Sequence, residues 1–176
     1  MENNEKFQDF EKEGRLKKTA IGILGILLLL LLLSYFLLSY PIFPILESLF
    51  ESKEAKNNKI FLEEFTINFL GGTYNDLQHN YHINQSVEFV SCLEGKKEGR
   101  EYFIEETYIP EVSDQSFNHI SFKPCSEDTI ILLHSHPYRR CIASGQDLLT
   151  LDNLKVLNPE RMMVIMCESD RFSVYN

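Results

Sequence analysis

The stretch IILLHSHPYRRCIASGQD, residues 130–147, contains the features of the chain that most constrain its fold. The apolar run 130–133 has the length and composition of a buried strand, and Pro137 ends that strand. Ser144 and Asp147 have the spacing of a capping box, so a helix is expected to begin there. The stretch therefore predicts a strand, a loop and a helix in that order.

Two histidines follow directly on this strand. His134 and His136 are two residues apart, so in an extended chain their side chains project to the same side. A helix start that faces the strand end brings Asp147 within reach of both imidazoles. Two imidazoles and one carboxylate can bind a divalent metal ion and leave a fourth position open, which is typical of catalytic zinc. These residues predict metal-assisted hydrolysis.

Each part of this pattern also has an explanation without a metal. A histidine pair can be a polar strand end, and Ser144 and Asp147 can serve only as a capping box that satisfies helix N–H groups. Neither explanation accounts for two histidines on one face, followed by proline, at this interval before the cap. The metal hypothesis accounts for these features together.

The HSHP run, six residues, Ser144, two residues and Asp147 resemble, without a gap, the signature of the JAMM (MPN+) zinc metalloproteases. That family includes the deubiquitinase of the proteasome lid and archaeal and bacterial relatives that cleave ubiquitin-like modifiers. The resemblance covers residues 60–176 and implies a cytidine-deaminase-like α/β domain. It also implies that His134, His136 and Asp147 bind Zn²⁺ and that Ser144 supports the tetrahedral intermediate.

The same family needs an upstream glutamate, typically in the pattern E-x-x-G-x-L-x-G. Residues 88–95 read EFVSCLEG, with Ser91 where glycine is common. The resemblance implies that Glu88 is the general base, which polarises the attacking water and passes its proton to the leaving amine. His119 has no partner at metal-ligand spacing and is expected to be a surface or core residue.

The four cysteines are widely spaced and contain no CxxC pair, which argues against a zinc finger or a thioredoxin-like site. Disulfides are expected if the domain lies outside the cell, and buried thiols if it lies inside. Cys141, in the loop before Ser144, is also a candidate fourth ligand that would block the site.

Hydrophobic periodicity and turn residues predict a mixed α/β sheet with flanking helices. Besides the helix from Ser144 to about Leu157, a helix is expected over 73–81, and Gly95 to Gly99 is expected to form a turn. The remaining predicted strands cover residues 60–62 (alternatively a short helix), 87–93, 101–109, 119–122, 129–133, 162–166 and 172–175.

The chain of 176 residues has room for one domain, and an apolar segment precedes it. A helix over residues 19–40 would be about 33 Å long, which matches a hydrocarbon core of roughly 30 Å. We expect a polar tail at 1–18, a transmembrane helix at 19–40 that contacts the lipid bilayer, a juxtamembrane stalk at 41–58 and the JAMM/MPN domain at 59–176. A cleaved signal peptide is the competing interpretation.

Charge suggests an orientation and excludes one class of partner. Arg15, Lys17 and Lys18 abut the N-terminal end of the apolar segment, so the N-terminus is expected in the cytoplasm and the domain outside. Residues 1–18 carry equal numbers of acids and bases, so the net charge of −9 belongs to the domain. Such an acidic domain is a poor binder of nucleic acid.

Together these features predict a membrane-anchored zinc metallopeptidase or isopeptidase of the JAMM type. The resemblance implies a protein or peptide substrate, such as a ubiquitin-like conjugate or a short extended tail. A cytosolic conjugate conflicts with an outside domain. Two alternatives remain open: a non-catalytic MPN scaffold or binding module, and a processing hydrolase for small peptide or thio-adducts.

Overall fold

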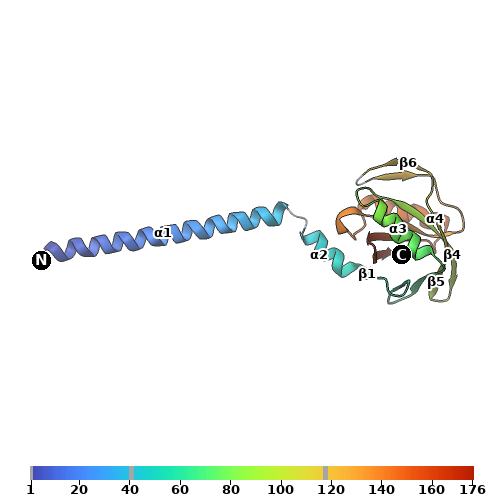
Figure 1. Cartoon of the computed structure of the whole chain (residues 1–176), viewed down its shortest axis with the longest axis horizontal. Coiled ribbons are helices and arrows are strands. Elements are labelled where there is room, and N and C mark those ends of the chain that lie inside the picture. Colours follow the sequence, from blue (N-terminus) through green and yellow to red (C-terminus); the bar gives the residue numbers. More distant parts are fainter. Residues whose placement is uncertain (1, 40–41, 117–118) are drawn as a thin grey trace. The chain divides into compact units, whose positions relative to one another are not determined.

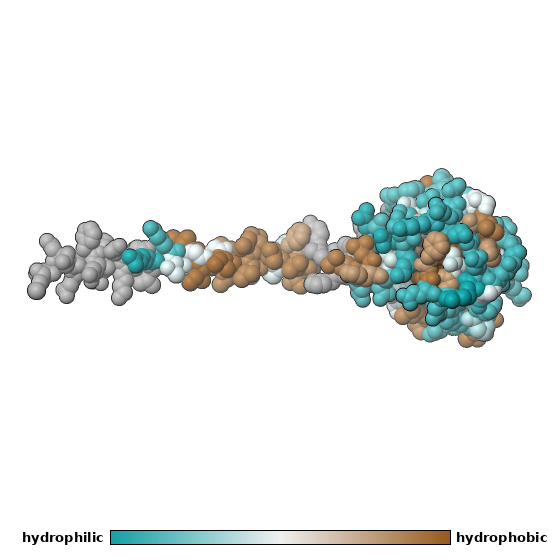
Figure 2. Space-filling view, turned by 90° about the horizontal axis from the view of Figure 1, so that it is seen from below, coloured by the Kyte–Doolittle hydropathy of each residue, from teal (hydrophilic) through white to brown (hydrophobic). Residues whose placement is uncertain are grey.

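The computed structural model describes residues 2–39, 42–116 and 119–176. The chain divides into two compact units, residues 1–42 and residues 43–176. The first unit consists of helix α1 (Glu2–Ser39), whose segment Lys17–Ser39 has a mean hydropathy of 2.9 and is long and apolar enough to cross a membrane. Figure 2 shows this segment as a hydrophobic surface. Cleavable signal sequences share this length and composition.

The second unit contains an eight-stranded mixed sheet (Figure 1). Its strand order is β1-β10-β9-β8-β4-β5-β3-β2, with the pairs β8–β9 and β3–β5 parallel and the others antiparallel. The prediction of a mixed α/β sheet with flanking helices is confirmed. The strands of this sheet are β1 (Lys53–Glu54), β2 (Lys59–Phe61), β3 (Thr66–Phe69), β4 (Val90–Glu98), β5 (Glu101–Tyr108), β8 (Thr129–Ser135), β9 (Met162–Glu168) and β10 (Arg171–Tyr175).

Further elements surround the sheet. Its first strand, β1, lies before residue 59, where the sequence places the start of the domain. A separate two-stranded sheet is formed by β6 (Val112–Gln115) and β7 (Ile120–Phe122). The other elements are α2 (Ile42–Glu51), α3 (Thr73–Ile83), the single 3₁₀ turn η1 (Pro137–Arg139) and α4 (Gly145–Leu157).

Alternating side chains of β8 and β9 divide the core between the two faces of the sheet. Ile131 and Leu133 of β8 belong to the larger cluster, which includes Leu77 of α3. Leu132, between them, belongs to the smaller cluster with Leu151 of α4. Helices α3 and α4 therefore cover opposite faces. Because His134 follows Leu132 by two residues, its side chain lies on the α4 face.

The turn predicted to begin at Gly95 is wrong. Strand β4 continues to Glu98, and Gly95 lies at a register shift in its pairing with β5. A Cβ atom at this position would overlap the backbone carbonyl of Phe103. Gly95 is thus required for the close approach of two strands at a bulge, and the chain turns at Gly99, where φ is 62°.

Candidate metal centre

The two histidines come from the end of β8. His134 is the second-last residue of the strand, and His136 follows it in extended conformation with φ −112° and ψ 127°. Both side chains are therefore on the α4 face of the sheet, and each residue is 5% exposed. Their Nε2 atoms are 3.1 Å apart. The spacing of the pair thus places two imidazole nitrogens at one point, as the alternation of a strand requires.

Asp147 reaches the same point from the first turn of α4. One carboxylate oxygen, Oδ1, is 3.2 Å from Nε2 of His134, and the other, Oδ2, is 3.4 Å from Nε2 of His136. The same carboxylate accepts a hydrogen bond from the N–H of Ser144 at 2.6 Å, while Ser144 Oγ accepts one from the N–H of Asp147 at 3.2 Å. The capping box and the contact with the histidines therefore coexist. The cap orients the carboxylate that faces the imidazoles.

The distances among these three side chains fit a tetrahedral metal ion. Zinc bonds to imidazole nitrogen and carboxylate oxygen of about 2.0–2.1 Å imply ligand-to-ligand distances of about 3.3 Å in a tetrahedron. The two Nε2 atoms are 3.1 Å apart, and the two carboxylate oxygens of Asp147 lie 3.2 Å from Nε2 of His134 and 3.4 Å from Nε2 of His136, respectively, all close to that value. His134, His136 and Asp147 could therefore bind one metal ion and leave a position open.

Backbone contacts orient the ring of His136. Its Nδ1 lies 3.0 Å from the carbonyl oxygen of Arg140, so Nδ1 carries the proton and Nε2 presents its lone pair. Its own backbone N–H donates to the carbonyl of Met166 at 3.1 Å. A histidine that binds a metal ion through one ring nitrogen commonly donates a hydrogen bond from the N–H of the other to a carbonyl group.

Burial and the neighbouring side chains shift the pKa of Asp147 in opposite directions. Burial alone would raise the pKa of this carboxyl, but hydrogen bonds from His134 and His136, and then from Ser144, outweigh it. The resulting pKa lies well below the ordinary aspartate range. Asp147 is therefore anionic at neutral pH, as a carboxylate that binds a metal ion must be.

Glu88 lies on the other side of the histidines, just before β4. Its carboxylate Oε1 is 3.8 Å from Nε2 of His136. The backbone of Glu88 is held by the small sheet, because its carbonyl accepts from Gln115 Nε2 at 2.6 Å and its N–H donates to the carbonyl of Ser116 at 3.1 Å. Burial is the main cause that raises the pKa of Glu88 above its ordinary value, and His136 and His134 partly oppose it.

Ser135, between the two histidines, ties the strand to Glu88. Its Oγ accepts a hydrogen bond from the N–H of Phe89 at 3.0 Å, and its own N–H donates to the carbonyl of Phe89 at 2.8 Å. Ser135 is 2% exposed and points to the face opposite His134 and His136. Ser135 could not be recognised from the sequence, because its hydrogen bonds to Phe89 form only when β8 lies beside the start of β4.

All five residues singled out for catalysis or metal binding line one cavity of about 370 Å³. The structure thus brings together His134, His136, Asp147, Glu88 and Ser144. His119 is exposed, and from its place just before β7 it also lines this cavity, a role that the sequence did not suggest. It was missed because its place depends on the pairing of β6 with β7, which the sequence pattern did not reveal.

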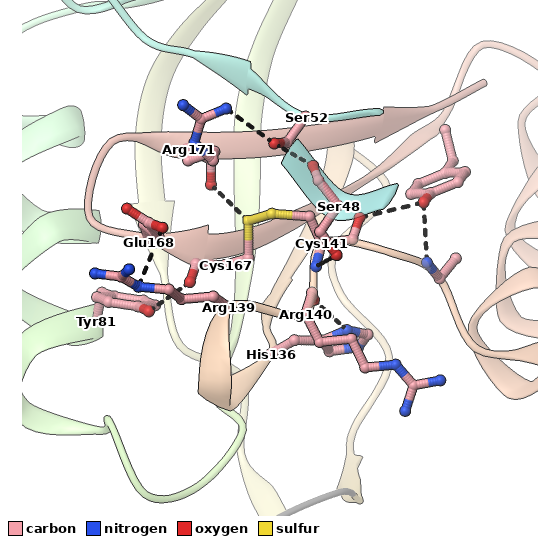
Figure 3. Close-up of a disulfide and its surroundings, with 12 residues drawn as sticks. Ser48, Ser52, Tyr81, His136, Arg139, Arg140, Cys141, Cys167, Glu168 and Arg171 are labelled. Carbon is pink, nitrogen blue, oxygen red and sulfur yellow. Dashed lines mark hydrogen bonds and ion pairs between the residues drawn. A yellow bond between two sulfur atoms is a disulfide. The ribbon is translucent and has the colours of Figure 1, made fainter. Parts of the chain in front are cut away.

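The hypothesis that Cys141 is a fourth metal ligand is wrong. Its sulfur is bonded to that of Cys167 on β9, and a second disulfide joins Cys92 to Cys125. Figure 3 shows the Cys141–Cys167 disulfide next to Arg140 and His136. The disulfide therefore connects the loop between His136 and Ser144 to β9, the strand that pairs with β8.

Comparisons with known proteins find similarity among solved structures only. No protein-family model matches the chain, and no curated protein matches it. Among solved structures, a JAB1/MPN domain protein from Archaeoglobus fulgidus is similar over 60% of this chain and 84% of its own, with 18% sequence identity and a TM-score of 0.37. A likeness of this size carries no argument about activity. The case for function is therefore made from the geometry of the site.

Proposed function

We propose that this chain is a membrane-anchored zinc metallopeptidase or isopeptidase of the JAMM type. The observation that carries the proposal is the convergence of His134, His136 and Asp147. Their two Nε2 atoms are 3.1 Å apart, each lies 3.2 or 3.4 Å from one of the two carboxylate oxygens of Asp147, and the carboxylate of Glu88 is 3.8 Å from Nε2 of His136. The ligands and the acid–base group line the same cavity. This combination is what hydrolysis of an amide by an activated water requires.

In this proposal His134, His136 and Asp147 hold the metal ion. Zinc, when bound, supplies the Lewis acidity that makes water a nucleophile at neutral pH. Glu88 takes the proton from the attacking water and delivers it to the leaving nitrogen. Its raised pKa favours this role, because a general base works best when its pKa is close to the working pH.

Ser144 is proposed to stabilise the negative charge that develops on the carbonyl oxygen. Its Oγ accepts a hydrogen bond from the N–H of Asp147, so its own proton remains available to a second acceptor. Ser144 also lines the cavity. A donor held at a helix N-terminus and aimed into a cavity suits oxyanion stabilisation.

The membrane anchor and the position of the domain outside the cytoplasm belong to the same proposal. The apolar length of Lys17–Ser39 and the bases before it support a span with the domain outside. The disulfides Cys92–Cys125 and Cys141–Cys167 support an oxidising compartment. The proposed substrate is therefore a protein or peptide outside the cytoplasm, and a cytosolic ubiquitin-like conjugate is disfavoured.

Metal analysis of the purified full-length chain in detergent tests this proposal. Wild-type protein is expected to hold about one zinc per chain and to cleave peptides from a panel of linear and lysine-branched substrates. His136→Ala should lose both zinc and cleavage, whereas His79→Ala, which removes an exposed histidine of α3, should lose neither. Equal, substoichiometric zinc in wild type and His136→Ala would overturn the metal assignment.

A further inference from the structure

Helix α2 has an unusual distribution of polar and apolar side chains. Ser48 of α2 and Ser52, one turn later and directly after the end of the helix, are 1% and 5% exposed and lie against the globular domain. Leu46, Leu49 and Phe50 share the other side of the helix and are 47%, 46% and 83% exposed. A surface helix normally buries its apolar side against the core. Here Ser48 and Ser52 face inward, and the large apolar side chains described on α2, those of Leu46, Leu49 and Phe50, face outward.

Hydrogen bonds fix α2 in this orientation (Figure 3). Ser48 Oγ accepts from the N–H of Cys141 at 2.9 Å. Ser52 Oγ accepts from Nη1 of Arg171 at 3.2 Å and donates to the carbonyl of Ser48 at 2.6 Å. Rotation of α2 about its axis to bury the apolar side would break these buried contacts, which is costly. The apolar side therefore stays outward and needs a cover from outside the domain.

The length of chain before α2 limits what that cover is. Two residues separate Ser39, the end of α1, from Ile42, the first residue of α2. Because a chain advances at most about 3.6 Å per residue, these two residues lie within about 11 Å of each other in any conformation. Headgroup layers are about 5–8 Å thick on each side of the hydrocarbon core. If α1 spans a bilayer, α2 must therefore begin in or beside its interface.

We propose that α2 is an interfacial membrane helix, with Leu46, Leu49 and Phe50 in lipid and Ser48 and Ser52 on the domain. The inference rests on the proposed membrane anchor. Apolar side chains on one face of a helix that lies in the bilayer interface are the usual form of such an element. The occupant of the apolar face is thus the lipid surface and not a second protein.

Charge indicates which lipid surface suits this helix. The remaining described side chains of α2 include the acids Glu47 and Glu51, and α2 contains no base. Attraction to anionic headgroups therefore adds nothing, and contact depends on the apolar side chains alone. Phosphatidylcholine vesicles are sufficient as the probe.

The arrangement places the candidate metal centre close to the membrane surface. Cys141, which donates to Ser48, directly follows Arg140, whose carbonyl oxygen lies 3.0 Å from Nδ1 of His136. Two consecutive residues of one loop thus contact α2 and a metal ligand. The interfacial helix holds the metal-ligand loop as well as the domain.

Tryptophan fluorescence tests the inference directly, because the natural chain contains no tryptophan. The full-length variants Phe50→Trp and Leu157→Trp are reconstituted in phosphatidylcholine vesicles, with and without lipid brominated near the headgroup end of its acyl chains. Leu157, at the end of α4, is 74% exposed and serves as the control. Phe50→Trp is expected to show blue-shifted emission that brominated lipid quenches by at least half, and Leu157→Trp little quenching.

Two results would overturn the inference. Red-shifted, unquenched emission from Phe50→Trp would place this face in water, and blue-shifted emission without quenching would show that protein covers it. A third variant, Leu33→Trp, places a tryptophan within the apolar segment of α1. It distinguishes failure of the interfacial-helix inference from failure of the proposed membrane anchor. Quenching of Leu33→Trp alone leaves the anchor intact and removes the interfacial helix. Loss of quenching at both positions removes the anchor as well. Unchanged zinc content verifies that each variant is folded.

Discussion

The Oγ of Ser135 accepts a hydrogen bond from the backbone N–H of Phe89 at 3.0 Å, and this contact joins the two strands that hold opposite parts of the candidate site. Ser135 lies between the two histidines, and Phe89 follows Glu88. The position of the Glu88 carboxylate relative to His136 therefore depends on a hydroxyl on the other face of the sheet. Ser135 is a positioning residue in the proposed reaction.

Replacement of this hydroxyl tests that assignment. Ser135→Ala leaves a buried N–H without its partner, which is expected to lower the free energy of unfolding by about 1–3 kcal/mol. Zinc content should stay unchanged, because neither imidazole contacts Ser135, while kcat should fall and KM change little. Ser173→Ala is the matched control, since it removes a buried hydroxyl without a hydrogen-bond partner in the described part of the chain. Equal effects of the two substitutions on kcat would contradict the prediction.

Glu88→Gln separates metal binding from proton transfer. The amide keeps the size of the side chain but cannot accept a proton, so hydrolysis should fall by roughly 10²–10⁴-fold. Zinc content should remain that of the wild type, because Glu88 is not among the three residues, His134, His136 and Asp147, proposed to bind the metal. Metal analysis and peptide cleavage on the same preparation check both parts. Retained cleavage would assign the acid–base role to another residue.

The raised pKa of Glu88 also predicts how pH affects the metal-free protein. From about pH 4.3 upward the unfolded chain loses this proton while the native state still holds it. Native protein then binds more protons than unfolded protein, so stability falls as pH rises through this window. Glu88→Gln removes the contribution of this carboxyl group to the pH dependence of stability. In chelator, urea unfolding should show the variant gaining stability over wild type as pH rises from 4 to 7, with little difference at pH 4.

The parts of the site that depend on local sequence could be predicted, and those that depend on strand pairing could not. His134, His136 and Asp147 follow from the alternation of a strand and the start of a helix, which are local patterns. Glu88 lies in the cavity because β4 pairs with β8, so its role came only from the resemblance to a family pattern. His119 depends on β6, a short polar strand with no hydrophobic periodicity of its own.

The same distinction explains the errors in the fold. Gly95 was interpreted as a turn because glycine commonly ends a strand, and its requirement for the close approach of Phe103 is visible only in the paired strands. The contacts of α2 with the domain could not be predicted either, because Ser48 in the helix and Ser52 just after it acquire their partners from residues about 90 and 120 positions later. Cysteine spacing alone likewise allows three pairings of four cysteines.

Comparison of the two disulfides tests whether Cys141–Cys167, which holds the loop between His136 and Ser144, contributes to zinc binding. The sequence separations are 26 for Cys141–Cys167 and 33 for Cys92–Cys125, so loss of either should cost a similar 2–4 kcal/mol in the free energy of unfolding. Only the first holds the loop between His136 and Ser144. The double variant Cys141→Ser/Cys167→Ser should therefore bind zinc more weakly by about 10–100-fold, as is typical when support of a ligand is lost.

The second double variant, Cys92→Ser/Cys125→Ser, is the control for this prediction. It should lose comparable stability and keep the zinc affinity of the wild type, because neither Cys92 nor Cys125 lies in the loop between His136 and Ser144. Competition with a chromophoric chelator at a temperature where both variants are folded measures the two affinities. Equal weakening in both would show that zinc binding follows global stability and not the bracing of the loop by Cys141.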